Sequence, residues 1–99
     1  MKRLAVLLTL VIVATPLLAD GKALYKSKCS ACHGPDGAGQ TTMGKKMTLR
    51  DLRSAEVQKQ TDLELTKVIA GGQGKMPAYG KQLSTDDIQG LIAHLRTLK

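Results

Sequence analysis

The feature that most constrains this chain is the segment Cys29-Ser30-Ala31-Cys32-His33, which holds both of its cysteines. Two cysteines separated by two residues and followed directly by histidine form the attachment signal for a c-type haem. A short helical turn spaces the sulfurs so that each can bond one vinyl group along the same porphyrin edge. We therefore predict Cys29 and Cys32 as covalent haem thioethers and His33 as an axial ligand of the iron.

The same two cysteines allow other interpretations. They could form a local disulfide, a redox-active dithiol, or half of a zinc site. A zinc site needs four ligands, and the only other histidine is the distant His94. A thioredoxin-like pair belongs beside a βαβ pattern, and the sequence contains none. These observations favour haem and leave a haem-free dithiol module as an alternative.

The chain is poor in large side chains for a core. Its 99 residues make at most one small domain, with no Phe, no Trp and two Tyr. Domains of this size bury a modest share of their surface and often depend on a disulfide or a metal. A bound porphyrin would supply the missing apolar bulk.

Residues 1–19 have the pattern of a cleaved secretory signal peptide. A basic start precedes an apolar run from Leu4 to Ala14, and Pro16 then breaks the segment before a small residue. An uncleaved membrane anchor is the alternative, but the run is shorter than the ~20 residues of a spanning helix. We therefore expect residues 20–99 to be an exported, soluble, periplasmic domain, with no stable membrane insertion after cleavage.

The charge balance favours an acidic partner. The formal net charge is +7 for the whole chain, and loss of Lys2 and Arg3 with the signal leaves thirteen basic and eight acidic residues, a net +5. Such a balance suits acidic protein surfaces. Nucleic acid is not expected, because aromatic side chains that could stack on bases are missing.

Residues 20–99 carry helical patterns and no strand pattern. We expect a first helix from Asp20 or Gly21 into the cysteine turn, and a second from Asp62, as its cap, to the glycines at 71–72. The last helix should begin at Ser84 or Thr85 and carry an apolar stripe of Ile88, Leu91, Ile92, Leu95 and Leu98.

The middle of the chain is expected to be less regular. Residues 34–46 have the glycines of a loop, and 48–52 could begin a short helix. A backbone carbonyl of the loop should accept the His33 Nδ1 hydrogen. Arg50 and Arg53 could pair with haem propionates or with surface carboxylates, and the surface pairing is the simpler expectation.

On these motifs the chain resembles the small bacterial class I monohaem cytochromes c. The resemblance covers nearly all of residues 20–99 and rests on Gly21-x-x-x-Tyr25, the Cys29-x-x-Cys32-His33 segment, Met76-Pro77 and the closing helix. It implies an all-α cytochrome c fold, in which three to five short helices wrap around one covalent haem c (heme c) and the N- and C-terminal helices cross. His94 stands where the family has Tyr or Phe, and we expect it to be structural.

Three methionines compete for the second axial position. Any thioether of Met43, Met47 or Met76 could bind iron, although methionine is more often core filler. The resemblance favours Met76, because the family places this ligand in such a loop, often before proline. The following Pro77 also stiffens the backbone that carries the sulfur.

An iron ligated by His33 and Met76 has no free position for a substrate. We therefore expect a one-electron carrier, not an enzyme, that shuttles electrons between periplasmic or membrane-bound redox partners. The alternative is a peroxidase-like haem enzyme with a labile Met ligand. We expect a monomer steered to an acidic oxidase subunit or dehydrogenase by lysines around the haem edge: Lys26, Lys28, Lys45, Lys46, Lys75 and Lys81.

Overall fold

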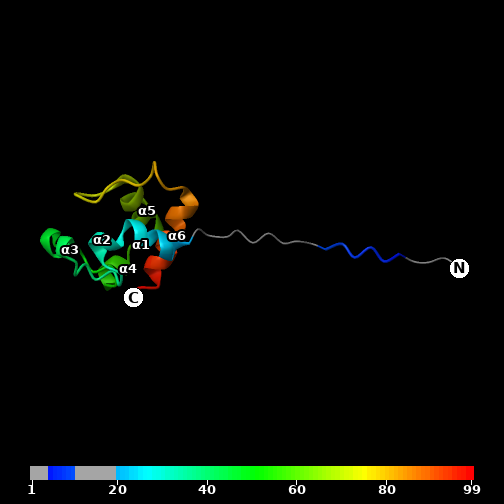
Figure 1. Cartoon of the computed structure of the whole chain (residues 1–99), viewed down its shortest axis with the longest axis horizontal. Helices are drawn as coiled ribbons and strands as arrows, with labels where there is room; N and C mark the ends of the chain where they lie inside the picture. The colour runs from blue at the N-terminus through cyan, green and yellow to red at the C-terminus, as the bar shows by residue number, and fades with distance from the viewer. Residues whose placement is uncertain (1–4, 11–19) are drawn as a thin grey trace.

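The structure, a computed structural model, describes residues 5–10 and 20–99. These residues form six helices: α1 (Gly21–Lys28), α2 (Ser30–His33), α3 (Thr42–Met47), α4 (Ala55–Gln58), α5 (Asp62–Gly71) and α6 (Thr85–Arg96) (Figure 1). Within them the only β pairing is an isolated bridge between Gln73 and Met76. The all-α class is confirmed. The helix count exceeds the expected range because α2 and α4 are single turns of four residues.

The first and last helices cross at the centre of the domain, as expected (Figure 1). Asp20 caps α1 by accepting the Ala23 N–H at 3.2 Å. Ser84 and Asp87 begin α6 with a reciprocal capping box. At the crossing, a Cβ on Gly21 would overlap the carbonyl oxygen of Gly90. Only glycine at position 21 therefore lets the two backbones approach this closely.

The core lies mainly on the inner faces of α1, α5 and α6, with Val57 of α4 and Leu83, just before α6, added to it. It is built mainly from aliphatic side chains, and Tyr25 and Leu91 are its largest fully buried members. The full cluster is Tyr25, Val57, Leu65, Ile69, Leu83, Ile88, Leu91, Ile92 and Leu95. Four of the five residues of the predicted α6 stripe belong to this cluster, and Leu98 packs at its edge.

The predicted cap of α5 is wrong by one residue. The N-cap is Thr61, whose hydroxyl accepts the Glu64 N–H at 3.1 Å, and Asp62 is the first helical residue. An acidic side chain there still interacts favourably with the positive end of the helix. The helix ends as predicted, because Gly72 at its C-cap has a φ of 76°.

The expected loop and short helix between residues 34 and 52 are also corrected. Helix α3 occupies residues that the glycine content assigned to a loop, and Thr41 caps it by accepting the Gly44 N–H at 2.8 Å. No helix begins at Thr48, whose left-handed conformation (φ 54°) ends α3 instead. The next turn starts only after Ser54, which caps α4.

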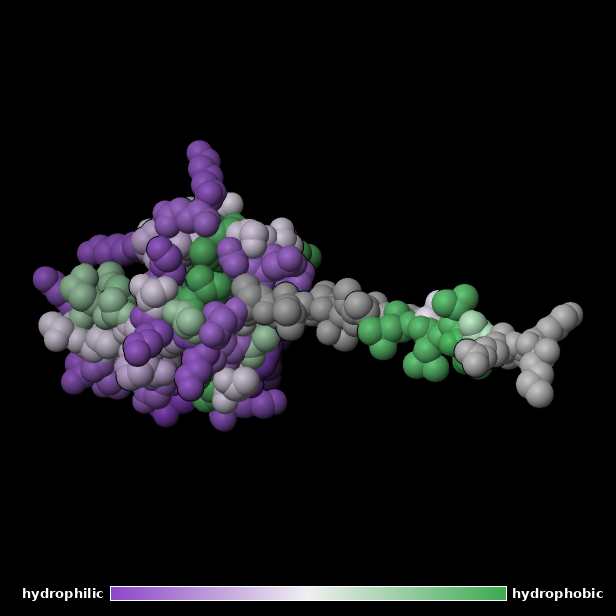
Figure 2. All heavy atoms as spheres, turned by 45° about the vertical axis from the view of Figure 1, so that its right-hand side comes forward, coloured by the Kyte–Doolittle hydropathy of each residue, from purple (hydrophilic) through white to green (hydrophobic). Residues whose placement is uncertain are grey.

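Residues 5–10 have no regular secondary structure, and their large apolar side chains are exposed (Figure 2). The rest of the predicted signal peptide, residues 1–4 and 11–19, lies outside the described residues. In the described part of the chain, no helix has the length and apolar character needed to cross a membrane.

Candidate functional site

A cavity of about 640 Å³ opens beside the core, between the cysteine turn and the chain after α5. Cys29, Cys32, His33 and Met76 all line it. Six core side chains form its apolar wall: Tyr25, Val57, Leu65, Ile69, Leu91 and Leu95. Its volume is typical of a cofactor pocket. The fold thus brings the four predicted site residues to one apolar cavity.

The two cysteines lie at the junction of α1 and α2. Both are free thiols of intermediate exposure. Burial raises the pKa of the Cys29 thiol to about 11. A reactive dithiol needs a depressed pKa, so this environment disfavours the oxidoreductase alternative. Among the residues that the structure describes, no three His, Cys, Asp or Glu side chains form a metal-binding group, which a zinc site would need.

His33 ends α2, and burial lowers the pKa of its imidazole. The neutral form, which can offer a lone pair to a metal, is therefore favoured. Its Nδ1 atom is buried and has no hydrogen-bond partner among the described residues, so the predicted backbone carbonyl acceptor is not found.

Three hydrogen bonds hold the backbone around His33. The Tyr25 hydroxyl donates to the Gly34 carbonyl at 2.5 Å, and the Thr41 hydroxyl donates to the Cys32 carbonyl at 2.6 Å. The Gly39 N–H donates to the carbonyl of His33 at 2.8 Å. Tyr25 of α1 and two residues that precede α3 thus hold the backbone of residues 32–34 in place.

The structure separates the three candidate methionines. Met76 and Met47 line the cavity, whereas Met43 does not and is 47% exposed. Met76 also packs against the core. Its N–H donates to the Gln73 carbonyl at 2.9 Å, and the Gln73 N–H donates back to the Met76 carbonyl at 3.2 Å. A Cβ on Gly72 would lie 2.7 Å from the Met76 carbonyl oxygen, so glycine is needed for this tight turn.

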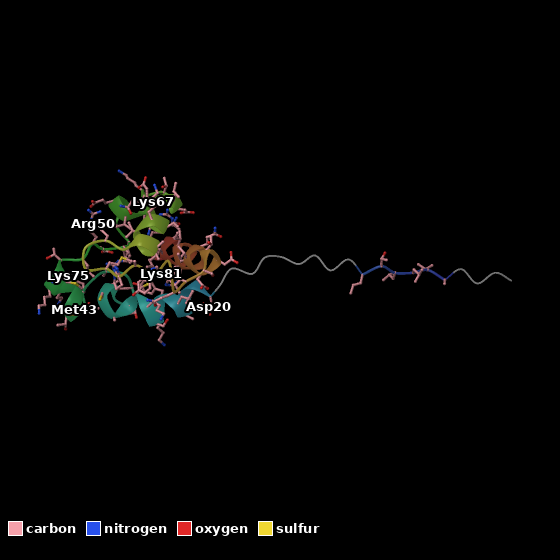
Figure 3. All side chains as sticks on the ribbon, turned by 90° about the horizontal axis from the view of Figure 1, so that it is seen from above. Asp20, Met43, Arg50, Lys67, Lys75 and Lys81 are labelled. Atoms are coloured by element: carbon pink, nitrogen blue, oxygen red, sulfur yellow. The ribbon has the colours of Figure 1, made fainter. Side chains whose placement is uncertain are left out.

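The charged groups on the cavity lining are basic. Lys28, Lys46, Arg50 and Lys75 line it, and none of the eight carboxylates does. Figure 3 shows Lys75 and Arg50 toward the end of the molecule opposite Asp20. The other predicted steering lysines, Lys26, Lys45 and Lys81, are exposed but lie off the lining.

The two arginines differ in their surroundings. Arg50 reaches the cavity and also pairs with Glu56 at 3.4 Å, with both side chains largely exposed. Arg53 is not on the lining and pairs with Asp51 at 2.9 Å. This exposed pair holds the pKa of the Asp51 carboxyl below its usual value through hydrogen bonds from Arg53. Surface pairing is therefore realised for both residues, and only Arg50 also faces the cavity.

Sequence reasoning missed Tyr79, which lines the cavity two residues after Pro77. Its hydroxyl donates to the Lys28 carbonyl at 3.1 Å and so crosses from the Met76 segment to the end of α1. An aromatic residue with a hydroxyl close to a candidate ligand was the signal available in the sequence.

These residues fit a covalently held haem. The cavity combines two thiols at the attachment spacing, an imidazole, a thioether and an apolar wall. An all-α fold with crossing terminal helices around such a site defines a small monohaem class I cytochrome c. A protein of this class works by electron transfer through a covalent c-type haem and is not an enzyme.

Comparisons with known proteins place the chain within this class. Residues 16–95 match the family described as "Cytochrome C oxidase, cbb3-type, subunit III", and the chain belongs to that family. Cytochrome c-553 of Helicobacter pylori is 37% identical over the whole of both chains. Cytochrome c6 of Cladophora glomerata is 33% identical over 78% of this chain and 84% of its own.

Two further similarities concern a larger protein and a solved structure. The cbb3-type cytochrome c oxidase subunit FixP of Azorhizobium caulinodans is 31% identical over 85% of this chain, which spans only 28% of FixP. The solved c-type cytochrome KustC0563 is 30% identical, with a TM-score of 0.75 over 81% of this chain and 98% of its own. The predicted family, all-α fold and cofactor are thereby confirmed.

Proposed function

We propose that this protein is a one-electron carrier whose haem is bonded to Cys29 and Cys32 and ligated by His33 and Met76. The observation that carries the proposal is the convergence of these four side chains on one apolar cavity, although Met76 lies far from the others in sequence. The haem, when bound, supplies reversible one-electron chemistry at its iron. With His33 and Met76 both bound to the iron, no position would be left for a substrate.

The surrounding side chains tune that chemistry. A neutral thioether such as that of Met76 favours the ferrous state more than a second imidazole would. The wall of Leu65, Ile69 and Leu91 excludes water and solvates the extra charge of the ferric state poorly. Both effects raise the reduction potential. The two covalent links would also limit rearrangement of the site between oxidation states.

Replacement of the methionines tests the axial assignment. The protein should be produced in a host that exports it and attaches haem, and its oxidised visible spectrum recorded. We expect Met76→Ala to abolish the sulfur-to-iron charge-transfer band. Met47→Ala is the matched control, because Met47 also lines the cavity, and it should keep the band. Loss of the band in Met47→Ala with its retention in Met76→Ala would reverse the assignment.

We propose acidic redox proteins as the partners. The support is the basic lining of the cavity mouth, formed by Lys28, Lys46, Arg50 and Lys75 without a carboxylate. Opposite charges at such a surface speed encounter and orient the partner. The family name and the similarity to FixP make a cytochrome c oxidase one class of partner to test. We propose that the carrier itself is a monomer, which size-exclusion chromatography with light scattering would test.

We also propose export to the periplasm with removal of residues 1–19. The described part of this segment, residues 5–10, exposes its apolar side chains and contributes none of them to the core. Among the described residues, the first helix begins at Gly21, after the Asp20 cap. The mass of the haem-containing protein from the periplasm should correspond to a chain beginning at or near Asp20. A mass that retains residues 1–19 would contradict cleavage.

A further inference from the structure

The segment from Gly72 to Gly80, here called the Met76 loop, is bound to α5 by its backbone. The Tyr79 N–H donates to the Ile69 carbonyl at 2.9 Å, and the Gly80 N–H donates to the Ala70 carbonyl at 3.0 Å. These bonds fix the end of the loop to the helix that precedes it. They do not fix the loop relative to the cysteine turn on the other side of the cavity.

One hydrogen bond makes that second connection. The Tyr79 hydroxyl donates to the carbonyl of Lys28 at 3.1 Å. Lys28 is the last residue of α1, where helix carbonyls lack an intrahelical partner, and it directly precedes Cys29. Among the hydrogen bonds between described residues, no other joins the Met76 loop to α1 or α2. The Tyr79 ring meanwhile packs against the core and lines the cavity.

We propose that Tyr79 is a positioning residue that latches the Met76 loop across the cavity. This inference rests on the proposed function, in which Met76 is an axial ligand. Withdrawal of the Met76 thioether requires the loop to move away from the cysteine turn, and that movement breaks the bond from Tyr79 to the Lys28 carbonyl. The hydroxyl therefore stabilises the closed, Met-ligated form relative to the open one. Tyr79 acts through the loop and needs no contact with the iron.

The substitution Tyr79→Phe removes the hydroxyl and keeps the ring. Imidazole, added to the oxidised holoprotein, competes with Met76 for the iron and can bind only when the loop is open. Its apparent affinity is the intrinsic affinity multiplied by the open fraction. Loss of a partly exposed hydrogen bond should raise that fraction about three- to five-fold. We therefore expect Tyr79→Phe to bind imidazole about three- to five-fold more tightly, measured by loss of the charge-transfer band.

His94→Ala is the control for global destabilisation. His94 is not among the residues that line the cavity, and its ring lies 5.0 Å from that of Tyr25, centroid to centroid. Loss of this aromatic pair should lower the global free energy of unfolding about as much as loss of one hydrogen bond. The imidazole affinity of His94→Ala should nevertheless stay at the wild-type value. Faster hydrogen exchange at the Met76 amide in Tyr79→Phe alone would support the same conclusion.

The outcomes separate this inference from the proposed function. A wild-type protein with the charge-transfer band, in which Tyr79→Phe binds imidazole no more tightly, overturns the latch and leaves Met76 as ligand. An equal rise in affinity for His94→Ala also overturns it, because global destabilisation would then explain the effect. A wild-type spectrum without the band overturns the Met76 assignment and the latch together.

Discussion

The ring of Tyr25 lies against the imidazole of His94, with centroids 5.0 Å apart and an interplanar angle of 47°. Tyr25 comes from α1 and His94 from α6, so the pair sits at the helix crossing. The family resemblance placed Tyr or Phe at position 94. In this protein the imidazole ring of His94 occupies that position and packs against Tyr25, which is only 2% exposed. The geometry supports the structural role that we expected for His94.

We expect His94→Ala to lower the free energy of unfolding of the holoprotein by about 1 kcal/mol, because it removes one partner of an aromatic pair. His94→Phe restores a ring of the kind that the family uses. It should stay within about 0.5 kcal/mol of wild type. Denaturant unfolding followed by circular dichroism measures both. An equal loss of stability in the two variants would mean that aromatic contact with Tyr25 does not account for the contribution of His94.

We expect Gly21→Ala to destabilise the holoprotein by about 3 kcal/mol, because a methyl group there overlaps the backbone of Gly90 and forces the crossing apart. Gly71→Ala is the control: a Cβ at Gly71 meets nothing within 4 Å. It should leave stability unchanged or raise it by up to about 0.5 kcal/mol through helix propensity. A similar response of the two glycines to thermal unfolding would contradict the close approach.

Tyr25 should make stability depend on alkaline pH. Burial, with smaller contributions from negative charge at Cys29 and Asp36, raises the pKa of its phenol from 10.0 to about 12. Because the folded-state pKa is raised, the stabilisation is complete below pH 10 and is lost as the pH rises from 10 to 12. A pKa rise of this size corresponds to about 2.7 kcal/mol. The loss should stay below this value, since the Cys29 charge disappears when the sulfur is a thioether.

The measurement compares the unfolding free energies of wild type and Tyr25→Phe across this pH range. The lysines titrate in both proteins, so only the difference between the two curves reports on Tyr25. The advantage of the wild type over the variant should shrink as the pH rises. A constant difference would show that the phenol titrates alike in the folded and unfolded chains.

Electron transfer to an acidic redox protein should slow as salt is added, because salt screens the attraction of the basic cavity mouth. At low ionic strength, the double variant Lys28→Gln/Lys46→Gln should transfer electrons more slowly than wild type, by a factor of up to about three. The double variant Lys59→Gln/Lys67→Gln makes the same change in net charge at exposed residues that do not line the cavity, and it should react at nearly the wild-type rate. Rates independent of salt, or equal losses in the two variants, would contradict steering.

Local signals in the sequence were sufficient for the class of the protein and for much of the fold. The Cys29–His33 segment predicts the cofactor because its chemistry depends on spacing within one turn. The long helices could be predicted because caps and apolar periodicity act within a few residues, as at Ser84 and along α6. The crossing could be anticipated only through the family resemblance, because contact between Gly21 and Gly90 joins opposite ends of the domain.

The remaining features depended on contacts between residues far apart in the chain. Helix α3 forms where glycines suggested a loop, because Thr41 caps it and also binds the Cys32 carbonyl. Composition could not distinguish Met43 from Met47, since only their places in the fold put one outside the cavity and the other on its lining. The bond from Tyr79 to Lys28 likewise joins segments that meet only after folding. Short-range chemistry therefore determined what this chain binds, and tertiary packing decided which side chains surround the site and hold it closed.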